Sequence, residues 1–160
     1  MNMKPVISFV GYANSGKTTL ICKILKQMSK TYNIVVIKHH GHLENNEIES
    51  NLKEKDTDKF LQCGAKDVFL IVGDESPTKI IEKLNIIYVD LIILEGFKKL
   101  SYPKFYIKRE NIEKIDYNLD NLTGIITDDV SGTGFNNIWF NIDDINSIVD
   151  FINFEFLKGE

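Results

Sequence analysis

The sequence predicts an α/β fold in which a mostly parallel sheet is flanked by helices on both faces. Short apolar runs alternate along the chain with segments whose apolar residues recur at helical spacing, which is typical of a sheet built from strand–helix units. The strand runs are continuously apolar, as expected of strands covered on both faces. A chain of 160 residues, 43% of them hydrophobic, can bury a sizeable core, and we expect residues 1–160 to form one domain.

The expected strands are the continuous apolar runs at residues 5–10, 33–38, 67–72, 90–94 and 122–127. A helix is expected over residues 18–30, because one face of it carries the apolar residues Leu20, Ile21, Ile24, Leu25 and Met28. Two shorter helices are expected at 57–65 and 77–84, the second with Ser76 as N-cap and Pro77 at its first position. The remaining expected elements are a strand at 103–110, with a hairpin onto the strand before it as one possibility, and an amphipathic helix at 143–157.

Charge and composition argue against several classes of protein. The net charge of −4 gives no basic face for nucleic acid or a membrane surface. The apolar run before Gly11 is too short for a signal sequence, and no later run approaches the roughly 18 apolar residues of a membrane span. Cys22 and Cys63 are far apart without C-x-x-C spacing, which suits reduced thiols in a cytoplasmic protein. We interpret both as small core residues, with a redox or ligand role as the alternative.

The stretch "GYANSGKTT" from Gly11 to Thr19 fits G-x-x-x-x-G-K-[ST] and lies between the first strand and the first helix, which is the context of a phosphate-binding P-loop. Its glycines permit backbone angles that turn successive N–H groups toward phosphate oxygens, and the helix start adds its positive dipole end. A P-loop NTPase fold follows, with a glycine-rich turn and a solvated lysine as the alternative. The expected nucleotide-binding residues here are Gly11, Asn14, Ser15, Gly16, Lys17, Thr18 and Thr19.

Within this loop, Lys17 is expected to reach the β- and γ-phosphates, and the Thr18 hydroxyl to ligate Mg²⁺. Glu95 ends a hydrophobic strand, where ligands of open α/β sheets bind, and Asp56 opens a helix after a long loop. Each is a candidate for the magnesium shell, although an N-cap is the commoner use of an aspartate such as Asp56. Asp90, at the other end of the strand, is expected to be solvated. Lys17 and Glu95 are the candidate catalytic residues.

With these residues assembled, the chain resembles the MobB family, the GTP-binding B proteins of molybdopterin-guanine dinucleotide biosynthesis. The match consists of "GYANSGKTTL", "IKHHGH", "KDTDKF" followed by "CGA", and "DLIILEGFK" followed by "YPK" and "IKRE". It spans roughly residues 5–110. The resemblance implies a P-loop NTPase fold, GTP as a ligand, homodimerisation, and partnership with the molybdopterin guanylyltransferase and molybdopterin-bearing proteins.

All three histidines, His39, His40 and His42, lie within four positions. The resembled family keeps histidines at the places of His39 and His42 without an established structural metal. One interpretation is therefore a loop over the active site that donates hydrogen bonds to phosphate or pterin groups; a plain solvated loop is another. A metal site is a third, but neighbours on an extended chain point to opposite sides, and no cysteine or fourth ligand lies nearby at zinc-finger spacing.

Of the 19 basic residues only Arg109 is an arginine, which suggests a place where a planar, bidentate donor is needed. Together with Lys98, Lys99 and Lys104 it marks an end of the sheet for a phosphate-bearing ligand, with a chance surface arginine as the alternative.

Base recognition is less defined. Thr127, Asp128 and Asp129 follow a late strand, where an aspartate can accept the N1–H and N2–H₂ groups of guanine. The usual [NT]-K-x-D pattern is absent because Asp128 stands in place of its lysine. Asp128 is our candidate, and a role as a turn residue is the alternative.

Three functions compete at this point. The first is a GTP-binding adapter in molybdenum cofactor maturation with weak GTP hydrolysis at most. The second is a metallochaperone GTPase, suggested by the histidines, although such proteins usually carry a longer histidine tract or a cysteine–histidine pair. The third is a small-molecule kinase, which a single arginine disfavours because kinases commonly hold the transferring phosphoryl group with several. We expect neither a nucleic acid nor a membrane as a partner.

Overall fold

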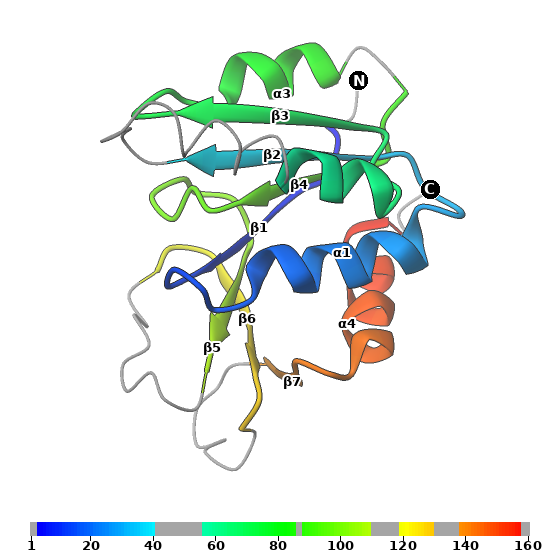
Figure 1. The fold of residues 1–160 in the computed structure, drawn as a ribbon, viewed down its shortest axis with the longest axis vertical. Helices are drawn as coiled ribbons and strands as arrows, with labels where there is room; N and C mark the ends of the chain where they lie inside the picture. Colours follow the sequence, from blue (N-terminus) through cyan, green and yellow to red (C-terminus); the bar gives the residue numbers. More distant parts are fainter. Residues whose placement is uncertain (1–2, 41–55, 86–87, 110–118, 130–137, 158–160) are drawn as a thin grey trace.

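The structure, a computed structural model, describes residues 3–40, 56–85, 88–109, 119–129 and 138–157. Within these ranges seven strands form one sheet in the order β3-β2-β4-β1-β5-β6-β7, and every neighbouring pair is parallel (Figure 1). The strands are β1 Val6–Gly11, β2 Ile34–His40, β3 Asp67–Val72, β4 Leu91–Glu95, β5 Lys104–Lys108, β6 Leu122–Thr127 and β7 Ile138–Asn141. The helices are α1 Lys17–Met28, residues 56–62, α3 Thr78–Leu84, α4 Ile145–Ile152 and a π-helical turn, η1, at Asn153–Leu157.

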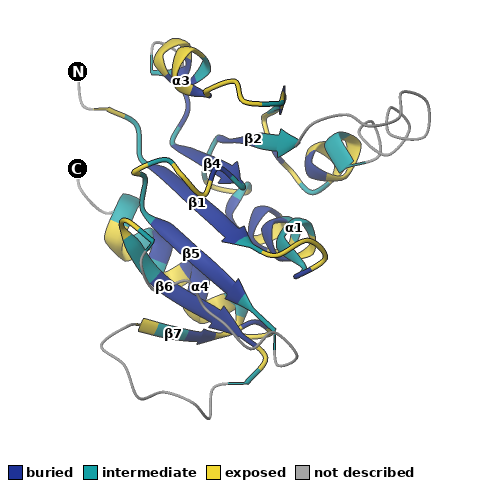
Figure 2. Ribbon diagram, turned by 90° about the vertical axis from the view of Figure 1, so that its left-hand side faces the viewer, coloured by how far each residue is buried: buried dark blue, intermediate teal, exposed yellow. Residues whose placement is uncertain are grey.

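Helices cover both faces of the sheet, as predicted. Along β1, Ile7 and Phe9 belong to the larger buried cluster, which includes residues of α1, of residues 56–62 and of α4. Val6 points the other way and packs in a second cluster with α3. The central strands are accordingly buried along most of their length, while the outer faces of the helices are exposed (Figure 2). This pattern explains why the strands read as continuous apolar runs in the sequence.

The order of the strands indicates the end of the sheet at which a ligand would bind. From β1 the chain crosses to β2 and β3 on one side, and after β4 it crosses to β5, β6 and β7 on the other. Ligands of open α/β sheets bind at the carboxyl ends of the strands where this direction reverses. Here those ends are Gly11 of β1, Glu95 of β4 and Lys108 of β5.

Several expectations about the elements need correction. Residues 104–108 form a strand, but it is no hairpin with β4: β5 pairs in parallel with β1 and β6. The helix α3 begins at Thr78 with Pro77 as its N-cap, although Ser76 Oγ accepts a hydrogen bond from the Thr78 amide at 3.3 Å. β7 was not predicted, because it is only four residues long and only one of them is buried.

Lys104 opens β5 and its side chain is fully buried. Its ammonium donates hydrogen bonds to the carbonyl oxygens of Tyr102 at 3.1 Å and Asp120 at 2.9 Å, and also to that of Leu100. A buried charge needs such partners, and three carbonyls are matched by the three protons of an ammonium. Lys104 therefore ties two loops to the amino end of the sheet. It lies at the opposite end of β5 from Arg109, so its expected part in a ligand site there is wrong.

The two cysteines are half-buried and free, and both pack against the larger cluster. Burial raises the pKa of the Cys22 thiol to about 12, with a further contribution from Cys63 beside it. Since the thiolate is the reactive form of cysteine, this shift keeps Cys22 unreactive at neutral pH and agrees with a packing role.

Candidate functional site

The loop between β1 and α1 has the geometry of an anion cradle. A Cβ on Gly11 would lie 2.8 Å from the carbonyl oxygen of Ile107 in β5, so only glycine lets the two strand ends approach this closely. Gly16 is the N-cap of α1 with a left-handed φ of 93°, and no side chain caps the helix. The first turn holds no acidic residue among its described side chains. The amides at the start of α1 are therefore available to an anion.

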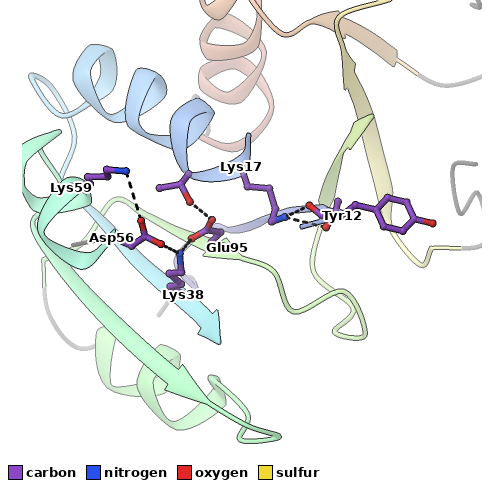
Figure 3. A network of polar contacts seen from close by, with 8 residues as sticks. Tyr12, Lys17, Lys38, Asp56, Lys59 and Glu95 are labelled. Atoms are coloured by element: carbon purple, nitrogen blue, oxygen red, sulfur yellow. Dashed lines mark hydrogen bonds and ion pairs between the residues drawn. The ribbon is translucent and has the colours of Figure 1, made fainter. Parts of the chain in front are cut away.

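Two polar side chains in this loop could contact a ligand. The Ser15 hydroxyl is buried and has no hydrogen-bond partner within the described part of the chain. The Lys17 ammonium folds back to donate hydrogen bonds to the carbonyl oxygens of Gly11 at 3.1 Å and Tyr12 at 2.6 Å (Figure 3). Burial lowers the pKa of Lys17, Glu95 partly offsets this effect, and Lys38 lowers the pKa further. Lys17 is thus held in the loop by two weak neutral acceptors that a phosphate can replace.

Glu95 contacts Thr18 at the start of α1 and Lys38 of β2, and Lys38 connects it to the helix at residues 56–62. Its Oε1 accepts a hydrogen bond from the Thr18 hydroxyl at 2.6 Å, and its Oε2 lies 3.2 Å from the ammonium of Lys38. Lys38 in turn donates a hydrogen bond to Asp56 Oδ2 at 2.6 Å (Figure 3). Burial alone would lower the pKa of Lys38, but Glu95 and Asp56 outweigh it and the pKa is raised. The structure thus brings together the three predicted magnesium residues, Thr18, Asp56 and Glu95.

These residues fit a hard divalent cation. Glu95 is only 5% exposed. Its Oε2 forms an ion pair with Lys38 and accepts no further hydrogen bond from the described residues. A buried carboxylate oxygen in that state is suited to a cation or to a metal-bound water, and hydroxyl and carboxylate oxygens are ligands that Mg²⁺ prefers. Asp90 takes no part in this group of residues, because it lies at the opposite end of β4. It was expected to be solvated, but its carboxylate accepts a hydrogen bond from the backbone N–H of Asn33 at 2.7 Å.

His39 and His40 are the last two residues of β2. They are therefore part of a strand and not of the loop that was expected there. His39 Nε2 is 2.8 Å from the carbonyl oxygen of Gly73, which can only accept, so Nε2 carries the proton. The ring packs on Phe97 with 5.0 Å between the ring centroids. His39 therefore ties the turns after β3 and β4 to the end of β2. His42 lies outside the described residues, and those that are described contain no group of three or more His, Cys, Asp or Glu placed to hold a metal.

The other predicted ligand residues fall on two sides of the P-loop. On one side, Lys98 and His39 line a cavity of about 620 Å³ that also borders Gly11. On the other, Arg109 follows β5 and forms an ion pair with Asp128 at 3.5 Å. The Arg109 guanidinium lies beside Gly16. A small cavity of about 100 Å³ on this second side is lined by Gly16, Thr19, Leu20, Lys23, Arg109, Ile142 and Asp143.

Two residues of the site were missed in the sequence. Lys38 is a charged residue at the end of a continuous apolar run, and that position was the available signal for it. Asp143 forms an ion pair with Lys23 at 3.6 Å; the sequence placed it at the start of the helix expected over 143–157, whereas it lies between β7 and α4. None of the helices in the described ranges has the length and apolar character needed to cross a bilayer.

Known proteins resemble this chain in sequence and in fold. Residues 6–128 match the family described as molybdopterin guanine dinucleotide synthesis protein B. A probable molybdopterin-guanine dinucleotide biosynthesis adapter protein of Bacillus subtilis is 34% identical over 124 residues, which are 69% of this chain and 70% of that protein. A putative adapter protein of the same name from Methanocaldococcus jannaschii is 32% identical over 154 residues, 90% of this chain and 60% of that protein.

Solved structures give the same picture. The crystal structure of Bacillus subtilis MobB aligns with a TM-score of 0.65 at 31% identity, covering 98% of this chain and 99% of that one. A MobB homologue from Bacillus stearothermophilus aligns with a TM-score of 0.64 over 94% of this chain and 97% of that one, at 20% identity. The second likeness shows a shared fold.

Proposed function

This chain belongs to the MobB family of molybdopterin-guanine dinucleotide biosynthesis proteins, and we propose that it acts there as an adapter that binds Mg²⁺·GTP at the loop from Gly11 to Thr19. The observation that carries the proposal is the contact between Thr18 and Glu95. It places a hydroxyl at the start of an uncapped helix 2.6 Å from a buried carboxylate at the end of a neighbouring strand. That pairing of groups is what a nucleotide-bound magnesium requires.

Each loop residue has a part in this proposal. The amides from Asn14 to Gly16 surround the phosphates, and Lys17 leaves its two carbonyls for the β- and γ-phosphates. Thr18 holds the metal with Glu95 and Asp56 in its shell. Bound magnesium would neutralise phosphate charge. Any hydrolysis would be slow, with Lys17 and Glu95 as the candidate residues that would act on the γ-phosphate.

The two sides of the P-loop then have different parts. Thr19 lies on the side of Arg109 and Asp128, where the small cavity and the ion pair support a place for the ribose and base. His39 and Lys98 line the larger cavity, which would face the γ-phosphate. As an adapter, the protein would bring GTP to the molybdopterin guanylyltransferase and to molybdopterin-bearing proteins, as a homodimer in the cytoplasm.

Calorimetry with GTP and ATP side by side, each with Mg²⁺, tests the proposal. We expect GTP to bind in a one-to-one ratio and ATP to bind more weakly. The same titration with the guanylyltransferase loaded with molybdopterin should show a ternary complex. Equal affinity for the two nucleotides would contradict the base choice, and no binding of either would contradict the nucleotide site.

The two carboxylates can be separated by their dependence on magnesium. Glu95→Gln keeps the shape of the side chain and removes its charge, so we expect the variant to bind GTP but to need about 10–100-fold more Mg²⁺ for tight binding. Asp56→Asn is the matched change at the partner carboxylate. A magnesium titration of GTP affinity on both variants is the measurement. If Asp56→Asn alone shows the defect, the metal belongs to Asp56, and Glu95 instead positions Thr18.

A further inference from the structure

Lys38 occupies the centre of the magnesium residues. Its ammonium is 2.6 Å from Asp56 Oδ2 and 3.2 Å from Glu95 Oε2, and its side chain is only 13% exposed. The two carboxylates come from different elements, the helix at residues 56–62 and the end of β4. Figure 3 shows Lys38 reaching between them. One positive charge thus separates two negative charges that belong to segments far apart in the sequence.

Among the described residues, Lys38 is the cation that forms ion pairs with both carboxylates. Lys17 also interacts electrostatically with Glu95, but its ammonium donates its hydrogen bonds to the carbonyl oxygens of Gly11 and Tyr12. Lys59 also lies near Asp56, but at 3.9 Å and with a side chain 62% exposed, so solvent screens most of its effect. Glu95 has the Thr18 hydroxyl on Oε1, while Oε2 accepts no hydrogen bond in the described chain. Without Lys38, the carboxylates of Asp56 and Glu95 would lose the positive charge that both of them contact.

We propose that Lys38 is a built-in counter-ion of a divalent-cation site made by Thr18, Asp56 and Glu95, and that it competes with the metal for the two carboxylates. In the absence of metal, Lys38 holds both carboxylates in place and keeps them from repelling each other. A divalent cation has to displace the ammonium from Glu95 and Asp56 before it can use their oxygens. The inference rests on the magnesium site of the proposed function, but it concerns the protein without nucleotide.

The competition makes metal binding depend on the nucleotide. Alone, a divalent cation gains two carboxylates but has to leave the Lys38 ammonium in a partly buried place beside it, which is unfavourable at such short distances. A triphosphate changes this balance, because it supplies ligands to the metal and a new anionic partner for Lys38. The intact protein is therefore expected to take up metal together with nucleotide, and to bind it poorly alone.

Lys38→Met tests the proposal directly, because methionine keeps most of the length of the side chain and removes its charge. The probe is Mn²⁺, which like Mg²⁺ prefers oxygen ligands, and its binding is followed by electron paramagnetic resonance on nucleotide-free protein. We expect Lys38→Met to bind one Mn²⁺ at least about tenfold more tightly than the parent does. Lys59→Met is the matched control, since it removes an exposed charge near the same carboxylate, and it should leave Mn²⁺ affinity at the parent's level.

A double variant separates a metal site from a general change of charge. Lys38→Met combined with Asp56→Asn restores the charge balance and removes a ligand, so the gain in Mn²⁺ affinity should disappear. The inference is wrong if Lys38→Met binds Mn²⁺ no better than Lys59→Met, or if the double variant keeps the gain. Should Lys38→Met not fold, as judged by circular dichroism, Lys38→Gln takes its place with the same expected outcomes. The Mn²⁺ measurement is made without nucleotide. Its outcome is therefore separate from that of the GTP titration, and a protein that failed to bind GTP could still show the expected gain in Mn²⁺ affinity.

Discussion

Lys17→Ala should lower the affinity for Mg²⁺·GTP by about 100-fold or more. Hydrogen bonds to charged groups contribute about 1.5–3 kcal/mol each, and the lysine is expected to make at least two with the phosphates. In the nucleotide-free protein its ammonium contacts only the carbonyls of Gly11 and Tyr12, so its loss removes little from the fold. Calorimetric titration with GTP measures the effect.

Lys26→Ala is the matched control for this experiment, because Lys26 is an exposed lysine in the last turn of the same helix. It should bind GTP as the parent does. A folded Lys17→Ala protein with the affinity of Lys26→Ala would show that the loop from Gly11 to Thr19 does not bind the phosphates.

Lys104→Met should lower the free energy of unfolding by about 3 kcal/mol, since each buried polar group left unsatisfied costs about 1–3 kcal/mol. The substitution keeps the volume but leaves the carbonyls of Leu100, Tyr102 and Asp120 without their shared donor. For a protein of this length that corresponds to a decrease of roughly 6–12 °C in the melting temperature. Differential scanning calorimetry provides the measurement.

Lys99→Met supplies the comparison for Lys104. Lys99 is exposed, and surface substitutions usually change stability by no more than about 0.5 kcal/mol. A Lys104→Met variant as stable as Lys99→Met would mean that water replaces the ammonium at the three carbonyls.

The sequence was most informative about features that are set by residues close together in the chain. The central strands were found because burial on both faces requires continuous apolar runs, and the P-loop was found because its residues are neighbours in the chain. The position of β5 was not found, because the pairing of a strand depends on the whole sheet: β5 follows β4 in sequence but lies on the far side of β1. β7 was missed because a short edge strand with exposed residues has no clear pattern.

The site follows the same rule. Thr18 and Glu95 could each be identified by its place in a motif or at a strand end. Lys38 has only its place at the end of an apolar run as a signal, because its partners Asp56 and Glu95 contact it only through folding. His39 was expected to contact a ligand, but in the structure its Nε2 is held by the carbonyl of Gly73, a partner that the sequence does not indicate.

The central place of β1 also has a consequence for how the protein is made. Ser8 in β1 bonds to the carbonyl of Gly96, 88 positions later in the chain, and both strands that pair with β1 are synthesised long after it. While the ribosome is still translating, the apolar residues of β1 have no sheet partner, and the P-loop is finished before the glutamate that it contacts exists. Pairings of this range form slowly and leave hydrophobic segments exposed to aggregation. In the growing chain, β1 can therefore complete its pairing only after β4 and β5 have left the exit tunnel.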